Sequence, residues 1–349
     1  CHCLAGGSRV WLCPWRARGA MATRGMRGDQ KSGNAVAASA RQAGLDSSNV
    51  RFDKTRSTDR SVFSLDSRRS PGTTPMVDQR ATAVFALAKQ MRQLRPALYA
   101  EPSIQFAIAA AYRKSKQPRE ANHLFAGIVR SHRVDMWSDC ARGELWLTNG
   151  KGLPPKPLLN CETTDSKPRL DGVLDDEVWM NRQTISLRSR LEDDQDWSTH
   201  VMLAHDDEFL YIAARCTKPP GVKYELDPQP RPRDPDLSGH DRIDVLIDID
   251  RDFATYYRLT IDHRGWVADA CWGDANWNPE WFVAADSNRD EWIVEAAIPL
   301  AELHFGPLPR DTTWAVGIQR TVPGVGFQSW SKPASIEPDP AGFGYLQFQ

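Results

Sequence analysis

Four tryptophans lie close together between residues 266 and 281, among carboxylate and amide side chains. The candidate ligand-contacting residues of this segment are Trp266, Trp272, Trp277, Trp281, Asp274 and Asn276. Aromatic rings stack against the C–H faces of pyranose sugars, while carboxylates and amides form hydrogen bonds with the hydroxyl groups. Gly273 and Pro279 interrupt the segment, which indicates a loop in which at least one indole is exposed. The segment therefore predicts a sugar-binding surface.

Two strands are predicted immediately before this segment. Apolar and polar side chains alternate with period two over residues 242–250, with Leu246 as the one exception. A second alternating run places Tyr257 and Leu259 on one face and Tyr256 and Arg258 on the other. An antiparallel pair with one apolar and one polar face is half-buried. We therefore add Tyr256 and Arg258 to the candidate sugar-binding residues.

Arg258 and Asp244 are expected to pair across these two strands. Such a pair either braces the sheet or holds sugar hydroxyls. Three carboxylates, Asp248, Asp250 and Asp252, follow at the end of the first strand in a D-x-D-x-D run. Oxygen ligands at this spacing are typical of calcium sites, but no EF-hand glycine and glutamate follow. The run predicts either a structural calcium site or a solvated strand end.

Several sequence blocks beyond residue 167 occur in a recognisable order. They include LDGVLDDEVW, DDEFLYIAARC, DRIDVLIDID, EWIVEAAIPLAEL and GFGYLQF. This order resembles the family 9 carbohydrate-binding modules and their DOMON-like relatives over about 180 residues. The resemblance implies an all-β sandwich of the jelly-roll or immunoglobulin-like kind over residues 167–349. It also implies a pair of tryptophans around a terminal sugar, and structural calcium.

The alternating strands support the same fold without the resemblance, because many short strands separated by Gly, Pro and Asp are typical of a two-sheet sandwich. Trp292 and Trp314 lie within strand-like blocks and are expected in the core. A haem-binding sandwich is the less favoured alternative, because the spacing of the histidines selects no axial ligands.

The chain before the sandwich divides into three parts. Residues 1–74 lack sustained apolar periodicity and are expected to form a disordered tail. Residues 75–150 have helical periodicity, with one helix beginning at Pro118 and another capped by Asp135. The order AxxYRKSKQPxxAxxLF there resembles a tetratricopeptide-type hairpin, which implies a possible protein partner. The proline-containing segment 151–166 is expected to be an extended linker.

Composition excludes several function classes. The net charge of −1 gives no global attraction to nucleic acid, and no apolar run reaches the roughly 18 residues of a membrane span. The chain has no GxSxG, HExxH or P-loop motif. Its cysteines are scattered, so the redox compartment and location stay open, and an extracellular or periplasmic location requires an export signal outside the printed N-terminus.

The sequence thus predicts a non-catalytic carbohydrate-binding module with a helical region before it. Two alternatives remain open. In the first, the sandwich is structural and the helical hairpin binds a protein. In the second, the chain is part of a glycoside hydrolase involved in carbohydrate catabolism.

Overall fold

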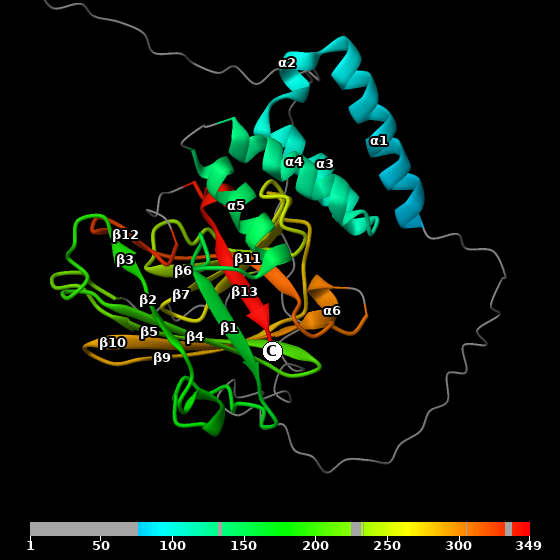
Figure 1. Ribbon diagram of the computed structural model, residues 1–349. Helices are drawn as coiled ribbons and strands as arrows, with labels where there is room; N and C mark the ends of the chain where they lie inside the picture. Colours follow the sequence, from blue (N-terminus) through cyan, green and yellow to red (C-terminus); the bar gives the residue numbers. More distant parts are fainter. Residues whose placement is uncertain (1–75, 132–134, 225–231, 233, 305, 332–336) are drawn as a thin grey trace, which may run out of the picture. The chain divides into compact units, whose positions relative to one another are not determined.

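The computed structural model describes residues 76–131, 135–224, 232, 234–304, 306–331 and 337–349. The predicted disordered tail, residues 1–74, lies outside these ranges. The described residues form a helical region followed by a large β-structure (Figure 1).

The helical region has the four longer helices that the periodicity predicts. The helices are α1 (Met76–Leu94), α2 (Pro96–Tyr99), α3 (Pro102–Lys114), α4 (Pro118–Arg130) and α5 (Met136–Asn149). Prolines occupy the first turns of α2, α3 and α4. In a first turn the backbone N–H that proline lacks would have no acceptor within the helix, so no hydrogen bond is lost. The side chain of Asp135 caps α5 by accepting a hydrogen bond from the backbone N–H of Ser138 at 2.9 Å. Within the described residues, no helix has both the length and the apolar character that a membrane span requires.

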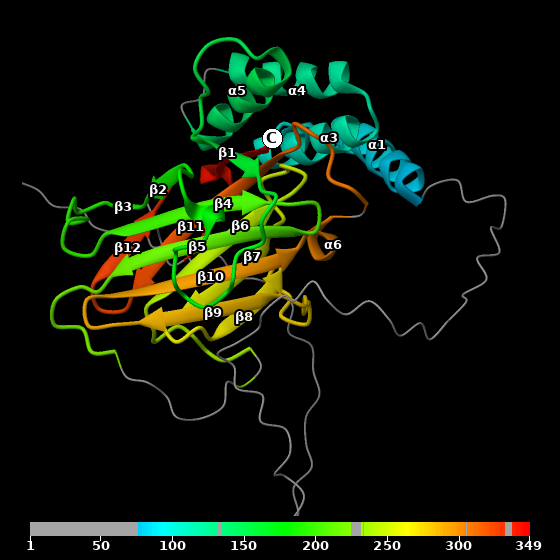
Figure 2. The same cartoon turned by 90° about the horizontal axis from the view of Figure 1, so that it is seen from below.

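The β-structure is a sheet of thirteen strands whose two halves form the layers of the predicted sandwich. The main path is β8-β7-β6-β11-β13-β1-β4-β5-β10-β9, and Figure 2 shows β4, β5, β10 and β9 side by side in one layer. The bounds are β1 Leu158–Thr163, β2 Thr184–Ser186, β3 Arg188–Ser189, β4 Thr199–His205, β5 Phe209–Thr217, β6 Arg242–Asp248, β7 Tyr257–Asp262, β8 Val267–Cys271, β9 Phe282–Ser287, β10 Glu291–Pro299, β11 Thr313–Val322, β12 Gly326–Ser329 and β13 Gly344–Phe348. A short helix, α6 (Leu300–Leu303), follows β10.

The main hydrophobic core lies between the two layers. Val245 and Leu259 from one layer share it with Ile212 and Val294 from the other. Trp292 and Trp314 are fully buried in this core, as predicted. The alternation of the strands therefore identifies the inward-facing side chains correctly.

The segment predicted as a linker, residues 151–166, differs from the expectation because it contains β1. This strand runs parallel to both β13 and β4, and it places Leu159 and Cys161 in the core. It therefore joins the two layers of the sandwich. The prolines at 154, 155 and 157 indicate an extended chain, but they end before the strand begins and say nothing about its pairing.

The outer face of β6 differs from the predicted half-buried strand. All seven residues of β6 are buried. Leu246, the exception in the alternation, belongs to a second core that also contains Phe106 of α3, Phe125 of α4 and Tyr345 of β13. The helical region thus covers the apolar part of this face, which explains why Leu246 interrupts the polar positions. The tetratricopeptide resemblance of α3 and α4, and a protein partner for them, remain predictions.

Candidate functional site

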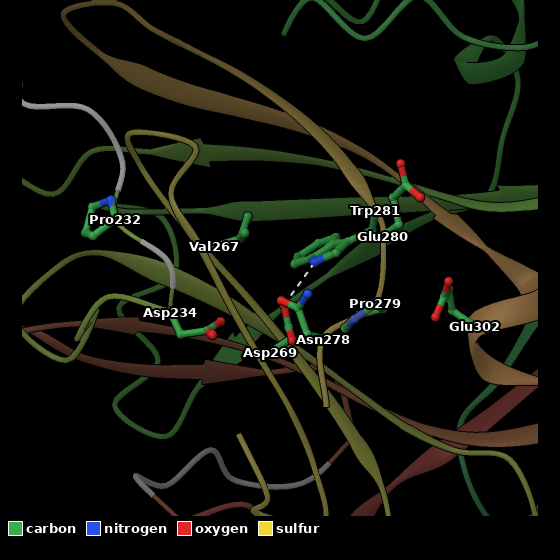
Figure 3. Close-up of a pocket in the computed structure, with 9 residues that line it drawn as sticks. All are labelled: Pro232, Asp234, Val267, Asp269, Asn278, Pro279, Glu280, Trp281 and Glu302. Atoms are coloured by element: carbon green, nitrogen blue, oxygen red, sulfur yellow. Dashed lines mark hydrogen bonds between the residues drawn. The ribbon is translucent and has the colours of Figure 1, made fainter. Parts of the chain in front are cut away.

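A pocket of about 700 Å³ is lined by β8, by the segment before β9, by α6 and by residues that precede β6 (Figure 3). Asp269 belongs to β8, and Trp281 immediately precedes β9. The lining residues are Pro232, Asp234, Val267, Asp269, Asn278, Pro279, Glu280, Trp281 and Glu302. The pocket therefore combines one aromatic side chain with several oxygen-bearing ones.

The Trp281 indole is held in place from two sides. Its ring packs against the main core, and its Nε1–H donates a hydrogen bond to Oδ2 of Asp269 at 3.2 Å (Figure 3). Asp269 is only 7 % exposed, because it follows Val267 at an inward position of β8. A fixed, half-buried indole presents a flat apolar surface at a low cost in conformational entropy.

The other predicted tryptophans lie outside this pocket. Trp277 packs against Tyr257, with ring centroids 4.7 Å apart, and against the main core. The Arg264 guanidinium lies 3.8 Å from the centroid of the Trp266 ring. Trp272 is 71 % exposed at a turn where its φ is 50°, so it is the one indole of the four that is largely open to solvent. Of the four tryptophans, the structure thus places only Trp281 in the pocket wall.

The predicted polar residues are also spread over several places. Oδ1 of Asp274 accepts hydrogen bonds from the backbone N–H and the side-chain amide of Asn276, so these two residues stabilise their own turn. Tyr256 packs edge-on against Phe343 beneath the helical region. Arg258 donates from Nε to Asp244 at 2.9 Å, which is the predicted cross-strand pair. It lines a neighbouring pocket of about 250 Å³, which shares Asp269 with the first one.

Sequence reasoning missed Asp269, Asn278 and Glu302 as pocket residues. Asp269 carries a usable signal, because a carboxylate at an inward strand position needs a hydrogen-bond partner. Glu302 carries no such signal, since α6 brings it to the pocket only through the tertiary fold.

The predicted metal-binding residues Asp248, Asp250 and Asp252 do come together. One oxygen from each lies within 4.8 Å of the others. Burial and the charges of Asp252 and Asp250 raise the pKa of Asp248 to about 8. Lys114 of α3 forms an ion pair with Asp250, and Oδ2 of Asp248 accepts a hydrogen bond from the backbone N–H of Phe253 at 2.8 Å. Carboxylate oxygens are ligands that calcium prefers. Lys114 already neutralises the charge of Asp250, however, so calcium binding stays a prediction.

Comparison with known proteins agrees with the fold. Residues 170–345 match the family described as carbohydrate family 9 binding domain-like. The chain belongs to this family. The match contains all nine lining residues of the pocket but not the helical region or β1.

Two solved structures similar to this family member come from Caldicellulosiruptor kristjanssonii. One is a family 9 carbohydrate-binding module in complex with cellotriose, with 16 % identity and a TM-score of 0.42; the alignment covers 55 % of this chain and 94 % of that one. The other is such a module in complex with glucose, with 17 % identity and a TM-score of 0.43, covering 54 % and 95 %. No curated protein matches the chain.

Proposed function

We propose that this chain binds carbohydrate without cleaving it, and that the pocket lined by β8 and the segment before β9 is the binding site. The observation that carries the proposal is the Trp281 indole, fixed by Asp269 at the wall of a pocket of about 700 Å³. Its polar neighbours, Asn278 among them, supply donors and acceptors for sugar hydroxyls. Membership of the carbohydrate family 9 binding domain-like family supports the same function.

The binding energy follows from the same contacts. Stacking a pyranose face on Trp281 contributes on the order of 1 kcal/mol, and each hydrogen bond from the polar wall adds about as much. A single sugar unit with a few such contacts would therefore bind with a Kd in roughly the micromolar to millimolar range. We accordingly expect weak binding of soluble oligosaccharides.

The proposal is tested by titrating the purified chain with neutral oligosaccharides while recording tryptophan fluorescence and heat. Trp281→Ala should abolish binding, and Asn278→Ala should weaken it with little effect on the melting temperature, because Asn278 is exposed. Trp272→Ala is the matched control, since it removes an indole of the same segment that does not line the pocket. Loss of binding with Trp272→Ala but not with Asn278→Ala would place the site elsewhere. No binding of any oligosaccharide would refute the proposal.

A further inference from the structure

The pocket wall has a strong charge bias that neutral sugar binding does not require. Four of the nine described lining residues are acidic, and no lysine or arginine is among them. The four carboxylates come from separate segments: Asp234 precedes β6, Asp269 lies in β8, Glu280 precedes β9 and Glu302 lies in α6. Figure 3 shows Asp234, Asp269 and Glu302 around the Trp281 indole. Four carboxyl groups around one aromatic side chain favour a ligand that carries positive charge.

The partial burial of three of the four carboxylates strengthens this effect. Asp269 is buried, while Asp234 and Glu302 are half-buried. Charges near a low-dielectric wall are screened less by salt than charges on an open surface. A hydrogen bond between an ammonium group and a carboxylate is also stronger than one between neutral groups. A ligand ammonium group at this wall therefore gains a weakly screened attraction to the carboxyl groups and a stronger hydrogen bond.

We propose, on the basis of the binding function above, that the pocket prefers sugars bearing a free amino group. A 2-amino-2-deoxy sugar retains the C–H face that stacks on Trp281, and it adds an ammonium group where neutral sugars have a hydroxyl. Acetylation of that nitrogen removes the charge and the preference. A sugar carboxylate, as in uronic acids, meets like charge and is disfavoured.

The test compares four oligosaccharide sets of equal length at about pH 6, where surface carboxylates are ionised. The probes are glucosamine, N-acetylglucosamine, glucose and uronic acid oligomers, measured by calorimetry at low and high salt. We expect glucosamine oligomers to bind about tenfold more tightly than glucose or N-acetylglucosamine oligomers, and uronate oligomers to bind most weakly. The preference should shrink at high salt.

Two charge-neutralising variants test whether the pocket itself is responsible. The double variant Glu280→Gln with Glu302→Gln should remove the preference, so that glucosamine and glucose oligomers bind with equal affinity, and it should leave the melting temperature unchanged. Glu120→Gln, which makes the same change on the exposed surface of α4, should leave the preference intact. Trp281→Ala should abolish binding of every probe.

The outcomes separate this inference from the proposed function. Equal binding of glucosamine and glucose oligomers, both lost in Trp281→Ala, refutes the amino-sugar preference and keeps carbohydrate binding. Tighter binding of uronates than of glucosamine oligomers also refutes it. Glucosamine binding that survives Trp281→Ala would be nonspecific attraction and would refute both.

Discussion

Replacing Glu144 by glutamine should strongly destabilise the protein, because this carboxylate holds the helical region to the sandwich. Glu144 lies in α5 and is only 2 % exposed. Its Oε1 accepts a hydrogen bond from Nε of Arg251 at 2.9 Å, and its Oε2 forms an ion pair with Arg113 of α3. Arg251 follows β6 in the sandwich, so one buried carboxylate neutralises cations from both regions.

The magnitude follows from what the substitution leaves behind. The guanidinium groups of Arg113 and Arg251 are largely buried and close enough to repel each other. Burial lowers the pKa of Arg113, and Glu144 counteracts this effect. Removing one partner of a buried ion pair costs about 3 kcal/mol or more, because the remaining charge is not compensated. For a protein of this size, such a loss lowers the melting temperature by roughly 6–12 °C.

The assay is chemical and thermal unfolding followed by far-UV circular dichroism and tryptophan fluorescence. Asp139→Asn is the matched control, because it also removes a carboxylate from α5, but one whose ion pair with Arg142 is exposed. Such surface pairs contribute about 0–1 kcal/mol. If Glu144→Gln costs no more than Asp139→Asn, the buried ionic contact does not hold the two regions together.

Three further outcomes are expected. First, Asp248 has a pKa of about 8 in the folded chain against 3.8 in the unfolded one, so stability should fall as the pH rises from about 4 to 8, and Asp248→Asn should flatten this slope in pH-dependent melts. Glu295→Gln should flatten the part below about pH 7, because burial raises the pKa of Glu295 to about 7. Second, if Asp248, Asp250 and Asp252 hold calcium, millimolar calcium should raise the melting temperature and a chelator should reverse the rise; an unchanged melt would leave the run as a strand end. Third, a fragment of residues 151–349 should fold better than one of residues 167–349, since only the longer one keeps β1; equal melts would show that β1 is dispensable.

The sequence predicts the sandwich well because its strands follow a local rule. Inward side chains such as Ile243 and Leu259 have polar neighbours on both sides. Trp292 and Trp314 are buried at inward positions of β10 and β11. The rule fails at β1, which pairs in parallel with two strands distant in sequence. Parallel pairing has no hairpin signal, so nothing local marks it.

The candidate pocket is harder to predict for the same reason. Its wall combines β8, the segment before β9, α6 and the loop before β6, and only the fold brings them together. A cluster of tryptophans in sequence locates the segment that contains Trp281, but it does not separate Trp281 from Trp277, which packs against Tyr257. Whether an indole lines the pocket depends on its neighbours in the folded chain. Trp277 packs against Tyr257 of β7, whereas Trp281 donates a hydrogen bond to Asp269 of β8.

The helical region and the candidate pocket contact different strands of the sheet. We therefore expect substitutions to affect stability and oligosaccharide affinity separately. The helical region contacts β6, β11 and β13, which are central in the order, through Leu246, Ala315 and Tyr345. The pocket is lined by β8 and by the segment before β9, and these two strands are the ends of that order. None of the pocket-lining residues belongs to the second core. Glu144→Gln should therefore lower the melting temperature and leave oligosaccharide affinity unchanged well below it, whereas Asn278→Ala should do the reverse. A parallel loss of both properties in Glu144→Gln would mean that the helices set the geometry of the sheet edges.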